Sequence, residues 1–506
     1  MGKGDIVKGY RSPEACGLDS REVLRCIREM DASENEIHGF VAERGGYIFA
    51  ESYLAPYAGD LPHTCHSLGK SYTCTAVGIV CTQGLLSVDD RITDLFGEEL
   101  AQWGIVPDEA MKELRLRHLM SMSVGMERMP ALDEHWMENF LREPVKYTPG
   151  TRFLYNSTGS CMLGAAVEKV TGMDLETYMR RHLFDKIGIG ARDLVWRRFE
   201  NGVCAEPGIS ATTGANLRLG MLYLAGGAVD GEQIISREWI EQAISRQVAN
   251  GDGRATNDQN SGYGWQLWLC HPDSMVRFDG GQGQFCLLDR SRDMAVAIHQ
   301  GGWHPGGAYQ MLVKAKELLQ SAAEHPLPEN PAAHRELTAY LRRRALPEGK
   351  VSRIPEGADG FSGVYRVTEG MLNPWIEVAP EQEDFYHLFY EPSFRSEIRC
   401  FSLELEADCI RVCWNGLSQM EFRLDGRWER GETPTPLVGL GAYAGTAYFE
   451  DEDVLHFTLK WLNGWCTPEL ILRRADSATL EIAVYKDMLH EGRAPFERHC
   501  TARRVR

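Results

Sequence analysis

Apolar residues in the first part of this chain recur at helical intervals. Val23, Ile27 and Met30 fall on one face of a predicted helix over 20–31. Gly84 and Gly172 stand where two further predicted helices end, and glycine is common just past a helix C-terminus. The same reasoning predicts helices over 67–83, 158–171, 215–226, 236–246 and 307–323.

Strand patterns stand before and after these helices. Two apolar runs, 39–44 and 47–52, flank Gly45 and Gly46, which tolerate the positive φ angles of a tight hairpin turn. Three more strands are predicted over 264–269, 285–289 and 294–299. Because strands come from both ends of the segment and helices from its middle, we expect an α+β domain over 1–325, with helices packed on an antiparallel sheet.

The composition and the hydrophobic pattern change after residue 325. Prolines cluster over 326–357 around one short predicted helix, 333–344, and this composition indicates a linker. Beyond it, many runs alternate apolar and polar residues, which is typical of strands with one buried face. These runs cover 363–367, 385–390, 401–406, 410–414, 420–424, 446–449, 455–461, 469–473 and 479–484. We therefore predict a smaller antiparallel all-β domain over 358–506, a sandwich or a barrel.

Composition and charge exclude several classes of partner and location. Of 506 residues, 43% are hydrophobic and 25% charged, close to the globular average. The formal net charge of −18 repels phosphate backbones and anionic lipid, so nucleic-acid and membrane-surface partners are not expected. No apolar run is long enough to span a membrane, and the first residues lack the apolar stretch of a secretory signal. We expect a cytoplasmic protein whose 14 cysteines are reduced.

A metal site is not expected. His63, Cys65 and His66 lie close together in the sequence, but no CxxC or HExxH signature accompanies them, and chance proximity is the favoured interpretation.

A serine and a lysine stand three residues apart at the head of one predicted helix. Ser67 and Lys70 therefore face the same side of its first turn. The helix N-terminus carries partial positive charge, which stabilises negative charge on the serine oxygen. A lysine amine whose pKa is lowered by burial or nearby positive charge can accept the serine proton. Such a pair also occurs by chance, so a second motif has to support it.

The second motif lies in the stretch 149–159, PGTRFLYNSTG, which contains Tyr155-Asn156-Ser157. With both motifs in this order, the chain resembles the superfamily of serine β-lactamases and penicillin-binding proteins, and within it the class C β-lactamase-related serine hydrolases. Four further segments agree with the resemblance, which covers about residues 20–325. These segments are 116–126, 208–212, 219–227 and 261–268.

The resemblance implies a β-lactamase/transpeptidase-like fold and assigns roles to residues. Ser67 would be the nucleophile, and Lys70 and Tyr155 would move its proton and later activate the deacylating water. An adjacent ammonium would favour the phenolate form of Tyr155. Ser157 stands where many relatives have Asn and can hydrogen-bond to Lys70 or to substrate. No metal or organic cofactor is implied.

The third motif of the family is altered here. Relatives carry Lys-Thr-Gly or His-x-Gly on the strand that lines the site, whereas this chain has Arg277, Asp279, Gly280 and Gly281 in that region. We expect Asp279 or Arg277 to take the place of the missing Lys or His. Asp279 would repel a substrate carboxylate, and Arg277 could bind one if it points inward, so weak or no β-lactam hydrolysis is expected.

The resemblance also locates the oxyanion hole. Its two donors would be the Ser67 amide and an amide of the glycine strand, which we place at Gly281.

Three functions remain open from the sequence alone. The first is hydrolysis of a small ester, amide or peptide through an acyl-enzyme. The second is acyl transfer from the same intermediate to an alcohol or amine. The third is a binding protein that keeps the fold without turnover. An α/β-hydrolase is excluded because the sequence has no Gly-x-Ser-x-Gly elbow. The sequence predicts neither the substrate nor the oligomeric state.

Overall fold

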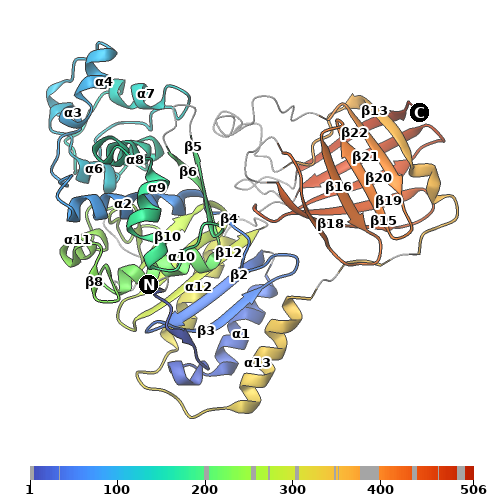
Figure 1. The fold of residues 1–506 in the computed structure, drawn as a ribbon, viewed down its shortest axis with the longest axis horizontal. Helices are drawn as coiled ribbons and strands as arrows, with labels where there is room; N and C mark the ends of the chain where they lie inside the picture. Colours follow the sequence, from blue (N-terminus) through green and yellow to red (C-terminus); the bar gives the residue numbers. More distant parts are fainter. Residues whose placement is uncertain are drawn as a thin grey trace.

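The computed structural model shows two lobes, a mixed α/β lobe in blue to yellow and a β-barrel in orange to red (Figure 1). It describes residues 5–33, 35–198, 204–251, 258–271, 274–301, 307–346, 349–351, 353–375, 398–435, 441–464, 467–486 and 496–505. The α+β domain followed by an all-β domain is therefore confirmed, and of the two expected β architectures the barrel is the one observed.

A twisted sheet forms the centre of the first lobe. In spatial order its described strands are β1 (Gly9–Tyr10), β3 (Tyr47–Tyr53), β2 (Glu36–Arg44), β12 (Met294–Gly301), β11 (Gln284–Asp289), β10 (Met275–Gly280) and β9 (Trp268–Leu269). Only β1 and β3 run parallel, and the other neighbours are antiparallel. The predicted hairpin is present, and its turn residues Gly45 and Gly46 have φ angles of 60° and 93°.

Three helices cover one face of this sheet: α1 (Ser20–Asp31), α12 (Gly307–Gln320) and α13 (Pro331–Arg344). The side chain of Asp19 caps α1 by accepting the Arg21 N–H. Ile27 and Met30 of α1 are buried in the same apolar cluster as Phe40 of β2. The α13 helix, which lies within the predicted linker, also packs on α1 and β3.

The other face carries the helices that surround the candidate site. Helix α10 (Thr213–Leu224) packs on β12 and β11, and α2 (Gly69–Thr82) packs on α8 (Ser157–Thr171). Smaller described helices are α3 (Ile92–Leu95), α4 (Gly97–Gln102), α5 (Glu109–Lys112), α6 (Leu116–Met120), α7 (Trp136–Arg142), α9 (Leu175–His182) and α11 (Arg237–Ala243). A second sheet has the strand order β4 (His63–Thr64), β6 (Cys204–Ala211) and β5 (Leu194–Arg198).

The C-terminal strands form one closed barrel. Its ring, within the described residues, consists of β16 (Ser418–Arg423), β15 (Cys409–Trp414), β14 (Cys400–Leu405), β13 (Gly363–Gly370), β22 (Phe496–Arg504), β21 (Thr479–Lys486), β20 (Pro468–Arg474), β19 (Val454–Trp461) and β18 (Ala442–Phe449). The parallel pair β16–β18 closes it, as a ring with an odd number of alternating strands requires. Strand β17 (Glu429–Glu432) pairs with β18 in antiparallel orientation. Tyr365, Phe401 and Phe422 fill the interior and are at most 2% exposed.

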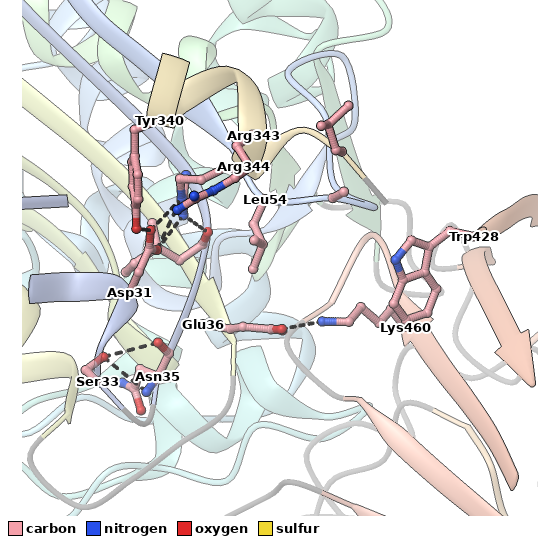
Figure 2. A pocket seen from close by; sticks show the side chains of 13 residues that line it. Asp31, Ser33, Asn35, Glu36, Leu54, Tyr340, Arg343, Arg344, Trp428 and Lys460 are labelled. Carbon is pink, nitrogen blue, oxygen red and sulfur yellow. Dashed lines mark hydrogen bonds and ion pairs between the residues drawn. The ribbon is translucent and has the colours of Figure 1, made fainter. Parts of the chain in front are cut away.

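The two lobes meet beside α13. A cavity of about 440 Å³ lies between them, lined by Arg344 and Asp31 from the first lobe and by Trp428 and Lys460 from the barrel (Figure 2). Asp31 holds Arg344 through two oxygens, and Glu36 pairs with Lys460 across the boundary.

Two sequence predictions differ from the structure, and a third is not tested by it. The predicted strand 264–269 is reduced to β9, because Gln266 has a left-handed backbone with a φ of 56°. The predicted helix 67–83 begins with a 3-10 turn, η2 (His66–Leu68), before α2 starts at Gly69. The predicted strand 385–390 lies outside the described residues. Across the residues that are described, no helix is long and apolar enough to cross a membrane.

Arg344 offers a test of how α13 is anchored. Its side chain is 4% exposed and bonds to Asp31, to the Ser52 hydroxyl and to the Ile37 carbonyl. Arg344→Met should lower the free energy of unfolding by about 3 kcal/mol, because the Asp31 carboxylate, whose side chain is 20% exposed, loses its cationic partner and keeps only the Tyr340 hydroxyl. Urea denaturation measures this change. The exposed neighbour Arg343 supplies the control, since Arg343→Met should shift stability by less than about 0.5 kcal/mol. Equal effects of the two variants would contradict the assigned anchor.

Candidate active site

Ser67 lies in the middle of the η2 turn, at the entrance to helix α2, and is half-buried. The strand before it is fixed by pairing of His63 with Ala211 and of Thr64 with Ser210. Next to the serine, His66 adopts a φ of 47°, a left-handed conformation that is costly for a residue with a Cβ atom. The surrounding pairing holds this strained turn and presents the serine hydroxyl at the helix N-terminus.

Lys70 lies directly beneath the serine. Its side chain is only 1% exposed, and its Nζ donates to Ser67 Oγ at 3.0 Å. The other candidate base next to the serine is His66, but burial lowers its pKa to about 3, which makes it a weak proton acceptor at neutral pH. Of these two neighbours, Lys70 is the one whose side chain is shown within hydrogen-bond distance of the serine hydroxyl.

Tyr155 borders the same space from the residue before the N-cap of α8. Lys70 Nζ lies 5.0 Å from the centroid of its ring. The Trp268 ring stacks on Tyr155 with centroids 5.9 Å apart, and the Arg277 guanidinium lies 5.4 Å from the centroid of the Trp268 ring. A basic side chain thus lies against each of the two stacked rings, and these contacts restrict the position of Tyr155.

The residues after Tyr155 have different roles. Asn156 is the N-cap of α8 and accepts the Gly159 N–H through Oδ1 at 2.8 Å, so its amide is committed to the helix. Ser157 is the first residue of α8 and is 8% exposed. The cap thereby determines where Tyr155 and Ser157 stand relative to the helix.

The altered third motif lies on β10, next to the η2 turn. Arg277 is 4% exposed, and its guanidinium bonds to Asp279 Oδ2 at 2.6 Å and to the Asp258 carbonyl at 2.8 Å. Asp279 is the more exposed partner, with 27% of its side chain accessible. The guanidinium of Arg277 is thus already engaged by protein oxygens, and Asp279 supplies the accessible charge.

Gly280 makes the closest approach between β10 and the serine turn. A Cβ atom at Gly280 would lie 2.0 Å from the Cys65 carbonyl oxygen, whereas one at Gly281 would lie 3.6 Å from the nearest His66 atom. Only glycine at 280 allows the two backbones to pack at this distance. The backbone of 280–281 thereby comes to the side of Ser67.

Two residues of the site were not identified from the sequence. Trp268 joins Tyr155 to Arg277, and the aromatic run Tyr263-Gly-Trp-Gln-Leu-Trp268 was its available signal. Gln266 is 2% exposed, accepts from Ser160 of α8 at 2.7 Å and donates to the Leu119 carbonyl at 2.9 Å. Its own carbonyl accepts from Ser71 of α2 at 2.9 Å, so one residue ties together the helices around Lys70.

The histidines and cysteine considered as metal ligands serve other contacts. His63 bonds to His38 at 2.9 Å and to the Thr64 carbonyl, and Cys65 Sγ lies 3.7 Å from Asn216 Oδ1. Among the residues that the structure describes, no group of three or more His, Cys, Asp or Glu side chains is arranged to hold a metal ion.

Comparison with known families agrees with this geometry. The model of the family named Beta-lactamase matches residues 37–319, which is more than half of the chain and includes all three motifs. The chain belongs to the Beta-lactamase family. The resemblance to serine β-lactamases found in the sequence and the fold expected for the first lobe are thereby confirmed.

Individual members of the Beta-lactamase family are distant. A 6-aminohexanoate-dimer hydrolase of Paenarthrobacter ureafaciens is 25% identical over 298 residues, covering 54% of this chain and 75% of that protein. Penicillin-binding protein 4* of Bacillus subtilis (strain 168) is 19% identical over 457 residues, covering 77% of this chain and 94% of that protein. A crystal structure from Bacteroides dorei DSM 17855, a "putative beta-lactamase", covers 60% of this chain and 98% of its own, with 16% identity and a TM-score of 0.50.

The close approach at Gly280 can be tested without knowledge of the substrate. Gly280→Ala must displace the Cys65 carbonyl, so it should lower the free energy of unfolding by about 2–3 kcal/mol, as overpacked sites do. Differential scanning calorimetry would show this as a lower Tm. Gly281→Ala meets only ordinary contacts and should leave the Tm nearly unchanged. Equal Tm values for both variants would show that β10 does not pack on the serine turn as described.

Proposed function

We propose that this protein is a serine hydrolase that cleaves an ester or amide through an acyl-enzyme on Ser67. The observation that carries the proposal is the 3.0 Å separation between Lys70 Nζ and Ser67 Oγ in a site where the lysine is almost fully buried. Membership of the Beta-lactamase family supports it. The cytoplasmic location stays a prediction.

The acylation step follows from this geometry. In its neutral form Lys70 accepts the proton of Ser67 as the serine oxygen attacks the carbonyl carbon of the substrate. The bond to the leaving group then breaks, and that group takes a proton from the Lys70–Tyr155 pair. This leaves an acyl-serine and a free alcohol or amine.

Deacylation reverses the same proton movements. A water molecule attacks the acyl-serine, and Tyr155 with Lys70 accepts the water proton. The serine oxygen then regains a proton as the acid leaves. The negative charge of both tetrahedral intermediates would be stabilised by the Ser67 N–H and by an N–H of the adjoining glycines, for which we propose Gly281.

The third motif favours uncharged or cationic substrates. Arg277 is engaged by Asp279 and by the Asp258 carbonyl, so the accessible charge on this strand is the Asp279 carboxylate. A substrate carboxylate would be repelled there, whereas an amine could pair with it. We therefore propose a small ester, an amide or an amine-bearing peptide as substrate, with little β-lactam hydrolysis. A relative named as a hydrolase of the 6-aminohexanoate dimer supports the inclusion of amides.

Kinetics with p-nitrophenyl butyrate test the catalytic assignment. Ser67→Ala should abolish nitrophenol release above background, since the nucleophile is lost. Lys70→Ala and Tyr155→Phe should each lower kcat/KM by about 100-fold or more, the scale of losing a general acid–base partner. The matched control for tyrosine removal is Tyr147→Phe, which changes a ring packed against Arg152. Rates of the Ser67 or Lys70 variants near wild type would refute the assigned roles.

The charge preference is tested by Asp279→Asn. With matched nitrophenyl esters of a carboxylate-bearing and an amine-bearing acid, the wild-type protein should prefer the amine-bearing ester. Asp279→Asn should shift the ratio of kcat/KM values by about 10-fold towards the carboxylate, as removal of one charge at partial exposure allows. Glu127→Gln, on the exposed surface, is the control. An unchanged ratio in Asp279→Asn would show that this carboxylate does not face the substrate.

A further inference from the structure

The barrel touches the segment that leads into the serine turn. Asn463 follows strand β19, and its carbonyl accepts the Thr64 N–H at 2.8 Å. The side chain of Asn463 donates from Nδ2 to the Pro62 carbonyl at 2.6 Å and accepts the Ala442 N–H at 3.0 Å. The barrel therefore holds the backbone of 62–64, a segment that ends shortly before Ser67.

A second contact comes from the barrel strand just before Asn463. Lys460 of β19, whose side chain is 7% exposed, pairs with Glu36 at the start of β2 (Figure 2). Burial opposes charge on Glu36, but the adjacent Lys460 ammonium outweighs it and holds the pKa of this carboxyl well below its usual range. Glu36 is thus a carboxylate at neutral pH and lies 3.4 Å from His38 Nε2.

Two histidines connect Glu36 with the segment that leads into the serine turn. His38 Nδ1 lies 2.9 Å from His63 Nε2, and His63 Nδ1 lies 2.9 Å from the Thr64 carbonyl oxygen. A carbonyl only accepts, so His63 Nδ1 carries the proton and, in neutral His63, Nε2 accepts from His38. The direction of the hydrogen bonds is thereby fixed along the chain from His38 to Thr64.

The histidine chain is enclosed and rigid. The Tyr57 ring stacks on His38 with centroids 3.6 Å apart, and His299 stacks on His63 at 4.7 Å. His299 is held in turn by Thr213 at 3.1 Å and by Asn216 at 2.8 Å. Burial lowers the pKa of His38 to about 4 and that of His299 to about 3. These rings therefore act mainly as fixed hydrogen-bonding groups.

We propose that Lys460 and Asn463 of the barrel are positioning residues for the nucleophile, acting through Glu36, His38 and His63 and through the backbone of 62–64. The two contacts converge on Thr64, one at its N–H and the other at its carbonyl. The proposal rests on the proposed role of Ser67. The function of the C-terminal barrel in this proposal is to hold the backbone of 62–64, which leads into the turn with the strained His66.

Hydrogen exchange and serine labelling test this coupling in the full-length protein. We compare wild type with Lys460→Met, with the isosteric Asn463→Asp, and with Lys350→Met, in which the lost ammonium bonds to Tyr448 of the barrel. Mass spectrometry follows amide exchange of peptides covering 60–70 and 39–50, and the rate at which a fluorophosphonate labels Ser67.

Lys460→Met and Asn463→Asp should accelerate exchange in 60–70 but not in 39–50. They should also slow labelling by about 10-fold to 100-fold, as a small displacement of a reacting group does. Lys350→Met should change neither quantity. In Glu36→Gln/Lys460→Met no buried charge is left unpaired, so labelling should recover to within about 3-fold of wild type.

The outcomes separate this inference from the proposed function. Unchanged exchange in 60–70 for both variants, or equal acceleration in 39–50, would overturn the positioning role, even if Ser67 is labelled in the wild type. Local acceleration in 60–70 together with no labelling of wild-type Ser67 would support the coupling and contradict the proposed function.

Discussion

The contact between Lys70 Nζ and Ser67 Oγ sets the requirements for the rest of the structure. A lysine that is 1% exposed is costly to bury, and it can serve as a base only if the serine stays within reach. The surrounding elements meet both conditions. The η2 turn leads directly into helix α2 and brings the two residues together, and Gln266 ties α2 to α8 and α6 around them. The Tyr155–Trp268–Arg277 stack adds a further contact, because Lys70 Nζ lies 5.0 Å from the centroid of the Tyr155 ring.

Close backbone packing is the second constraint. The serine turn contains a residue with a positive φ, His66, and it is held between β6 on one side and the Gly280 strand on the other. The barrel adds a third support at Thr64 through Asn463. A strained nucleophile turn persists only where neighbouring structure over-determines it, and here that structure comes from segments far apart in the chain.

Much of this architecture could be predicted from local patterns. The spacing of Val23, Ile27 and Met30 identified α1, and Gly45-Gly46 identified the first hairpin, because period and turn chemistry are local properties. Ser67 and Lys70 could be paired because one helical turn joins them. The catalytic roles of Ser67, Lys70 and Tyr155 and the domain boundaries stay predictions.

Features that depend on distant residues could not be predicted in this way. The Arg277 guanidinium is engaged by Asp279 and by the Asp258 carbonyl, and only the fold brings the Asp258 carbonyl to it. Likewise, no local sequence pattern indicates the series of contacts from Lys460 to His63.

The most direct test of the catalytic mechanism is the intact mass of the protein during turnover of p-nitrophenyl butyrate, followed by peptide mapping. We predict a transient mass increase of one butyryl group on the peptide containing Ser67, decaying as nitrophenol accumulates and absent in Ser67→Ala. Decay only after an alcohol or amine is added would indicate an acyltransferase with the same nucleophile. Nitrophenol release without acylation of Ser67, or acylation at another residue, would contradict the mechanism.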